Sequence, residues 1–189
     1  MESYFKKDNT DREGRITRKE LAEYTLIGDG KDGEVYRISD DKCVKLFFKE
    51  DIQEKELEAL QAGQSSPVIP RLYEYGKNYI VMEFVKGTSL ARILKKEQQI
   101  TEELTNKILL MLDELKKIGF TRWDTEIRHV LINEEGNLKV IDHKRAFSSE
   151  SPVPTKLLKG FKKYGLSGDF LAHVNQLRPS VYSEWKKYK

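Results

Sequence analysis

The residues best suited to chemistry in this sequence are a glycine-rich turn and a lysine that follows it. Residues 28–35 read Gly-Asp-Gly-Lys-Asp-Gly-Glu-Val and fit the pattern G-x-G-x-x-G-x-V. Glycine suits a turn beside phosphate groups, because a backbone without Cβ atoms can approach phosphate closely. Lys45 stands among apolar neighbours in a strand-like run, where its buried charge requires an anion for compensation. Together these features predict a site for a phosphate-bearing ligand.

Each of these signals has a competing interpretation. Dinucleotide-binding turns share the glycine spacing, but there the last glycine opens a helix, whereas residues 34–38 have the composition of a strand. Lys45 alone fits equally an edge-strand lysine whose stem crosses apolar surface. The helix expected at 50–62 supplies a carboxylate for Lys45, and the inward-facing Glu56 is the preferred partner, with Glu54 as the alternative.

The elements that position these residues can be read from the hydrophobic pattern. Short runs rich in β-branched and aromatic residues, separated by turn residues, predict strands, and one helical run follows the third of them. After about residue 86 the pattern becomes helical, interrupted by a hairpin over 130–141. We therefore expect an α+β fold of two lobes: a five-stranded antiparallel sheet plus one helix, then a reduced, mainly helical lobe. The expected strands and helix of the first lobe occupy residues 24–27, 35–38, 43–48, 50–62, 71–75 and 79–84.

The chain divides into three segments on this interpretation. Residues 1–22 are polar, lack clear periodicity and are expected to form a flexible or weakly helical N-terminal extension. Residues 23–85 form the first lobe and residues 86–189 the second.

The composition indicates the class of protein, its cellular location and its partners. The 189 residues are 38% hydrophobic and 34% charged, which is typical of a globular domain. A single cysteine, Cys43, forms no internal disulfide, the N-terminus does not resemble a signal peptide, and no apolar run approaches the roughly 18 residues of a membrane span. We expect a cytoplasmic protein without a membrane partner. From His143 onward ten Lys/Arg face three Asp/Glu; a solvated surface explains this better than nucleic-acid binding, since base-stacking motifs are absent.

In these features the sequence resembles the protein kinase superfamily, over about residues 24–147. Residues 121–124, Thr-Arg-Trp-Asp, are similar to the His-Arg-Asp catalytic loop, and residues 141–144, Ile-Asp-His-Lys, take the place of Asp-Phe-Gly. The resemblance implies that Asp124 orients the acceptor hydroxyl and accepts its proton, while Asp142 holds magnesium on the β- and γ-phosphates of ATP. The chain is short and its motifs keep only part of the common kinase sequences, and in both respects it resembles small atypical kinases of the RIO type.

The same resemblance implies a set of nucleotide contacts. Residues 79–87 look like the fifth strand and the hinge of a kinase, with Met82 as gatekeeper and the backbones of Glu83 and Val85 facing the adenine edge. Lys45, paired with Glu56, would hold the phosphates and act in catalysis. The implied nucleotide-binding residues are Gly28, Gly30, Gly33, Val35, Lys45, Met82, Glu83 and Val85.

Two departures from the family pattern fall near the catalytic loop. His129 stands where kinases have the asparagine that ligates a second magnesium, so it becomes the candidate second metal ligand, although imidazole prefers softer metals. Glu126 stands where protein kinases have a lysine, and Arg128 or Lys144 could supply the missing charge.

The sequence thus predicts an ATP- and magnesium-dependent phosphotransferase, specifically a serine/threonine-protein kinase acting on an unidentified protein or small-molecule acceptor. Two alternatives stay open. The altered loop also suits a pseudokinase that binds nucleotide without transferring phosphate, and the same lobes and aspartates occur in small-molecule kinases.

Overall fold

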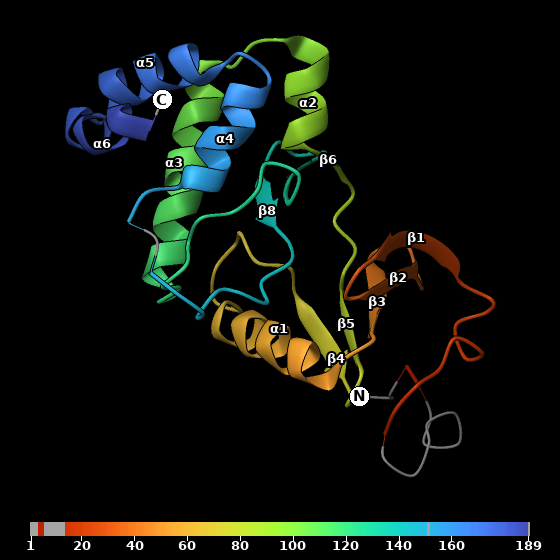
Figure 1. The fold of residues 1–189 in the computed structure, drawn as a ribbon. Coiled ribbons are helices and arrows are strands. Elements are labelled where there is room, and N and C mark those ends of the chain that lie inside the picture. Colours follow the sequence, from red (N-terminus) through yellow and green to blue (C-terminus); the bar gives the residue numbers. More distant parts are fainter. Residues whose placement is uncertain (1–3, 6–13, 151, 189) are drawn as a thin grey trace.

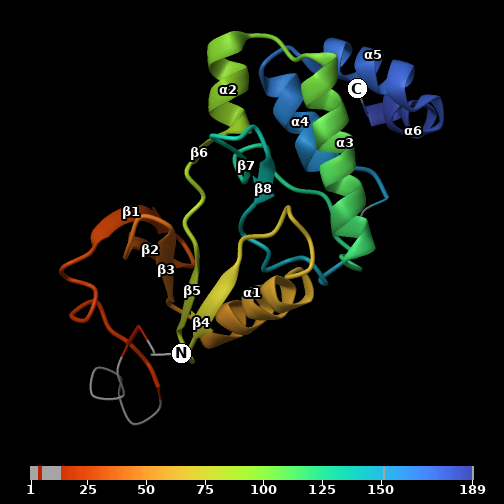
Figure 2. The same ribbon diagram turned by 180° about the vertical axis from the view of Figure 1, so that it is seen from behind.

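The chain forms two parts joined by a single extended strand-like connection, as Figure 1 shows, and Figure 2 gives the view from behind. The computed structural model describes residues 4–5, 14–150 and 152–188. One part contains a sheet with a helix beside it, and the other is mainly helical. This architecture confirms the predicted α+β fold.

The first part is a five-stranded antiparallel sheet in the order β1-β2-β3-β5-β4. Short turns join β1 to β2, β2 to β3 and β4 to β5, since antiparallel neighbours can be joined by hairpins. The connection from β3 to β4 instead contains a helix, and it places β5 rather than β4 beside β3. Helix α1 follows β3 and has good helix formers and two acidic residues in its first turn, which suits the positive end of the helix dipole. The elements are β1 (Thr25–Gly30), β2 (Gly33–Arg37), β3 (Lys42–Phe47), α1 (Glu50–Ala62), β4 (Leu72–Tyr75) and β5 (Tyr79–Glu83).

The described part of the N-terminal extension packs on this sheet. Residues 18–23 form turns, and Ile16 and Leu21 are buried together with Phe5. These side chains are too widely spaced to produce a helical or strand period, so the sequence pattern missed their burial. Residues 1–3 and 6–13 of the predicted extension lie outside the described residues. The sheet residues of this small core are Tyr36, Val44, Leu46, Tyr79 and Val81.

The second part contains a three-stranded sheet and five α-helices among the described residues. The predicted hairpin is present as β7 and β8, but a third strand, β6, pairs with β7 and was not predicted because its three residues, Gly-Thr-Ser, include no large apolar side chain. Thr101 caps α3, as its position in the sequence suggests. The elements are β6 (Gly87–Ser89), α2 (Leu90–Glu97), α3 (Glu102–Lys117), β7 (Val130–Asn133), β8 (Leu138–Val140), α4 (Thr155–Lys163), α5 (Ser167–Leu177) and α6 (Pro179–Trp185).

Two polar contacts fasten the α1–β4 connection to the second part. The Val140 N–H donates to the Val68 carbonyl at 2.8 Å. The Ser66 hydroxyl donates to the carboxylate of Glu114 on α3, also at 2.8 Å. The main hydrophobic core continues across this junction from α1 to α3, so the edge of the first part that carries α1 is held firmly. No helix in the described ranges is both long and apolar enough to cross a membrane.

Candidate functional site

The principal cavity lies between the two parts and has a volume of about 800 Å³. It is of the size that takes a nucleotide or a drug-sized ligand. The glycine-rich turn, the third strand, the hinge and the segment after β8 all contribute to its walls. All but one of the predicted site residues line it: Gly28, Gly30, Gly33, Val35, Lys45, Glu56, Met82, Glu83, Val85, His129 and Asp142.

The Lys45 ammonium and the Glu56 carboxylate form an ion pair across this cavity wall. The two groups are 2.6 Å apart, and their side chains are 12% and 3% exposed. The preference for Glu56 over Glu54 agrees with the structure, in which Glu54 is exposed. Burial raises the pKa of Glu56, while the Lys45 ammonium acts in the opposite direction. The pair places a fixed cation at the wall of the cavity.

Two of the three glycines are not required by packing. A Cβ atom added to Gly28 or Gly30 would make only ordinary contacts, at 3.6 Å or more. A Cβ atom at Gly33 would instead lie 2.1 Å from the Leu46 carbonyl oxygen. Glycine at 33 is thus explained by the close approach of β3, whereas glycine at 28 and 30 is suited to a ligand that approaches the backbone.

The hinge is held by both parts of the molecule. The Glu83 N–H donates to the Arg71 carbonyl at 2.8 Å, and the Glu83 carboxylate accepts from Lys139 on β8 at 2.8 Å. Met82 and Val85 are buried beside it. The Glu83 carbonyl faces the Cys43 thiol at 3.7 Å, and burial raises the pKa of that thiol to about 12, so Cys43 is a packing residue and not a nucleophile.

Asp142 occupies a strained position at the junction with the second part. Its φ of 63° lies in the left-handed region, which non-glycine residues rarely adopt and which is common at functional sites. Its Oδ1 atom is buried and accepts no hydrogen bond within the described structure; the Lys144 ammonium lies 3.5 Å away. A buried carboxylate oxygen without a hydrogen-bond donor is suited to a hard cation such as Mg²⁺.

The imidazole of His129 lies beside Asp142, with 3.7 Å between Nε2 and Oδ2. Burial lowers the pKa of His129, which favours the neutral ring. A neutral imidazole offers nitrogen, whereas Mg²⁺ selects oxygen ligands. Asp142 therefore fits magnesium, and His129 fits it poorly.

Asp124, the remaining predicted residue, lines a separate cavity of about 200 Å³ that adjoins the first. Its carboxylate accepts hydrogen bonds from the Lys156 and Leu157 N–H groups and from the Thr155 hydroxyl, at 3.0 to 3.3 Å. Burial raises the pKa of Asp124, and these hydrogen bonds oppose the shift. Asp124 thus caps α4, the kind of structural role that an isolated aspartate often has.

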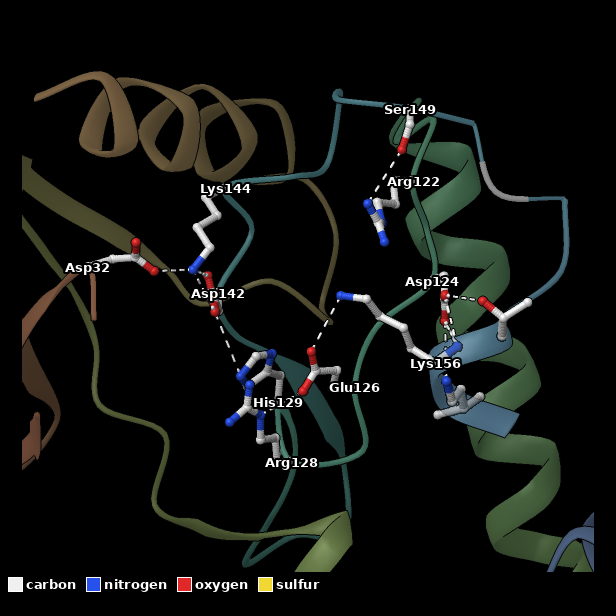
Figure 3. Close-up of polar contacts among 12 residues, drawn as sticks. Asp32, Arg122, Asp124, Glu126, Arg128, His129, Asp142, Lys144, Ser149 and Lys156 are labelled. Atoms are coloured by element: carbon white, nitrogen blue, oxygen red, sulfur yellow. Dashed lines mark hydrogen bonds and ion pairs between the residues drawn. The ribbon is translucent and has the colours of Figure 1, made fainter. Parts of the chain in front are cut away.

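Glu126 lies between Asp124 and Asp142 in Figure 3 and forms ion pairs with two cations. Its carboxylate contacts Arg128 at 2.7 Å and Lys156 at 3.4 Å. Lys156 comes from α4, and no sequence signal connects it with the catalytic loop, so its place at this site could be found only from the fold. The ammonium of Lys156 thus lies beside Glu126, at the position where protein kinases have a lysine in the catalytic loop.

A two-part fold with a lysine–glutamate pair and an aspartate facing one cleft defines the protein kinase-like class. Comparison with known families narrows this further, because the RIO domain profile matches residues 7–160. The chain belongs to the RIO domain family of the protein kinase-like superfamily.

Similar proteins are named as kinases. YrzF of Bacillus subtilis, named as a candidate serine/threonine-protein kinase, is 28% identical over 130 residues, covering 66% of this chain and 60% of its own length. The serine/threonine-protein kinase cot-1 of Neurospora crassa is 26% identical over 136 residues, 67% of this chain and 23% of its own. Human ribosomal protein S6 kinase alpha-2 is 29% identical over 134 residues, 61% of this chain and 18% of its own. The match thus spans 60% or less of each relative.

Proposed function

We propose that the protein is an ATP-dependent phosphotransferase that acts on serine or threonine hydroxyls with magnesium as cofactor. One observation carries this proposal: the Lys45–Glu56 ion pair and the buried, hydrogen-bond-free oxygen of Asp142 face the same cleft. Kinase-like families generally use ATP and Mg²⁺. Binding of a nucleoside triphosphate requires a fixed cation for the phosphates and a carboxylate for the metal ion.

The residues of the cleft have distinct roles on this proposal. Residues 23–85 bind the nucleotide: the glycine turn covers the phosphates, Lys45 contacts them, and Glu56 keeps the ammonium in place. The backbones of Glu83 and Val85 bind the adenine edge. Asp142 holds Mg²⁺, which neutralises charge on the phosphates when bound.

Residues 86–189 supply the acceptor side. Asp124 would orient the acceptor hydroxyl and take its proton, while the bond from the acceptor oxygen to the γ-phosphorus forms and the bond to the β-bridging oxygen breaks. The Thr155 hydroxyl already donates to Asp124 at 3.2 Å. An acceptor hydroxyl would take over that hydrogen bond, and the small cavity beside it would receive the acceptor side chain.

The second candidate function is nucleotide binding without transfer. The capping of α4 by Asp124 favours it, because three donors at the start of α4 already engage the carboxylate that an acceptor hydroxyl would need. In that case the cleft would bind ATP and magnesium and no acceptor would be phosphorylated.

A transfer assay with radiolabelled ATP and magnesium tests the proposal, using a mixture of serine- and threonine-containing peptides and a parallel set of sugars. We expect peptide labelling by the wild-type protein and a loss of about 100-fold or more in both Asp124→Asn and Asp142→Asn. Asp169→Asn, an exposed carboxylate of α5, is the matched control and should label normally. Nucleotide binding without label on any acceptor would establish the second function, and labelling of sugars alone would replace serine/threonine by a small-molecule acceptor.

A further inference from the structure

Lys144 joins the glycine-rich turn to the metal-binding aspartate. Its ammonium forms an ion pair with Asp32, which lies at the tip of the turn between β1 and β2, and lies 3.5 Å from Asp142 (Figure 3). The three side chains are only 21 to 25% exposed. An ammonium therefore stands between two carboxylates that come from the two parts of the molecule.

Lys144 also lies where the two cavities meet. Five residues line both the large cleft and the small acceptor cavity, so they mark the passage between the two. A phosphoryl group that moves from nucleotide to acceptor must pass these residues. The five are Arg128, His129, Asp142, His143 and Lys144.

Two permanent cations belong to this group, and they differ in their availability. Arg128 is paired with Glu126, and its side chain is 67% exposed. Lys144 is largely buried and is paired with Asp32, a residue outside the passage itself. A buried ammonium stays charged only with anions around it, and a terminal phosphate carries more charge and more acceptor atoms than one carboxylate.

We propose that Lys144 binds the terminal phosphate of the nucleoside triphosphate, and that Asp32 holds the ammonium in place while the cleft is empty. The inference rests on the proposed nucleotide site. On nucleotide binding the Lys144 ammonium exchanges the Asp32 carboxylate for phosphate oxygens and keeps its proximity to Asp142. Lys144 thereby supplies the positive charge that Glu126 removes from the catalytic loop, and the site distinguishes a triphosphate from a diphosphate.

Substitution of Lys144 and of Asp32 should change the affinity for a triphosphate in opposite directions if Lys144 binds phosphate, but not if the ion pair is only a structural link. Lys144→Ala removes a phosphate ligand, so affinity for a triphosphate should fall. Asp32→Asn removes the competing counter-ion and a negative charge beside the phosphates, so affinity for a triphosphate should rise. If the ion pair served only to hold the turn against the second part, both substitutions would break the same link and change affinity in the same direction.

Isothermal titration calorimetry with magnesium and either ADP or a non-hydrolysable ATP analogue tests the proposal. We expect Lys144→Ala to weaken binding of the analogue about tenfold or more and that of ADP no more than about threefold, as for loss of one charge-assisted contact. Lys144→Arg should recover part of the loss, and Asp32→Asn should tighten the analogue about threefold or more through lost like-charge repulsion. Lys159→Ala on α4 is the control, because that lysine is exposed and lines neither cavity.

Each other outcome counts against a specific part of the account. Equal losses for the ATP analogue and ADP in Lys144→Ala, or weaker analogue binding in Asp32→Asn, overturn the role of Lys144 while leaving nucleotide binding intact. Failure of the folded wild-type protein to bind either nucleotide overturns the proposed function as well. Thermal unfolding of each variant establishes that it is folded before titration.

Discussion

The two walls of the cleft differ in how closely they keep the kinase pattern. The wall formed by the first part contains the glycine turn, the Lys45–Glu56 ion pair and the hinge in the expected arrangement. The wall formed by the second part has Glu126 and His129 at positions where kinases have lysine and asparagine, and its Asp124 caps a helix. On the proposed function, the nucleotide side of the cleft keeps the residue types of the kinase pattern, whereas the acceptor side departs from that pattern around α4.

This difference has a physical origin. Nucleotide binding requires a cation, a metal-binding carboxylate and an apolar slot. The cation, Lys45, and the hinge beside the slot belong to the sheet of the first part, and only the carboxylate of Asp142 comes from the second part. The acceptor side is formed by loops and by the N-terminus of α4, which can be altered without unfolding the domain.

The largest effect is expected for Glu56→Gln in the first wall. The substitution leaves the Lys45 ammonium buried without a counter-charge, and loss of one partner from a buried pair costs about 3–5 kcal/mol. Urea unfolding should show this loss, whereas Glu54→Gln on the exposed side of α1 should change the free energy of unfolding by less than about 0.5 kcal/mol. Similar values for both variants would mean that the pair does not stabilise this wall.

The pH dependence of stability should report on the second wall through His143. Burial lowers its pKa to about 4, and its Nε2 donates to the Val140 carbonyl at 2.7 Å. The unfolded chain, with an ordinary histidine pKa, binds the proton more readily, so stability is complete above about pH 6.5 and falls as the pH drops toward 4.

For a fully buried group this shift corresponds to about 3 kcal/mol over that range. Urea titrations at several pH values should therefore give a flatter profile for His143→Gln than for the wild-type protein. Both proteins contain the same carboxylates, so their contribution cancels when the two profiles are subtracted. Parallel profiles would contradict a buried, neutral His143.

Much of the first wall could be predicted from the sequence, for reasons that lie in particular residues. A lysine within an apolar strand and a glutamate on the inward face of the next helix are both unusual locally, so the Lys45–Glu56 contact followed from pattern alone. The burial of Ile16 and Leu21 did not follow, because isolated apolar residues among turns have no period. Strand β6 was missed because its three residues are defined only by their pairing with β7.

The second wall was predicted less well because its geometry depends on contacts distant in sequence. The sequence predicted a catalytic role for Asp124, and the structure places this residue at the small cavity, but its hydrogen bonds to Lys156 and Leu157 join residues more than 30 positions apart. The same holds for the contact between Lys144 and Asp32, which are 112 positions apart. Local patterns contain no information about such pairs.

A smaller effect is expected where α4 meets Asp124. Thr155→Val removes the hydroxyl that donates to the Asp124 carboxylate and keeps the shape of the side chain, which should cost about 1 kcal/mol of stability. Nucleotide affinity should stay within about twofold, because α4 lies on the other wall. Ser183→Ala on α6 provides a control for loss of an exposed hydroxyl. A large loss of nucleotide affinity in Thr155→Val would contradict the independence of the two walls.

The smallest effect is expected for His129→Asn. The substitution restores an amide oxygen beside Asp142, and oxygen is the ligand that Mg²⁺ prefers, so half-saturation should require a few-fold less magnesium. Titration of magnesium at fixed ATP, followed by the binding signal, measures this directly. An unchanged or higher magnesium requirement would show that the imidazole already serves the metal.

The most direct test of the central claim compares the two aspartates by their effect on binding of ATP with magnesium. Calorimetry should show that Asp124→Asn binds within about twofold of the wild-type protein, because Asp124 lies outside the nucleotide cleft. Asp142→Asn should lose about tenfold or more of the magnesium-dependent affinity, because it weakens a metal ligand. Equal losses in both variants, or full magnesium-dependent binding by Asp142→Asn, would contradict a nucleotide site built on Asp142 and separate from the acceptor wall.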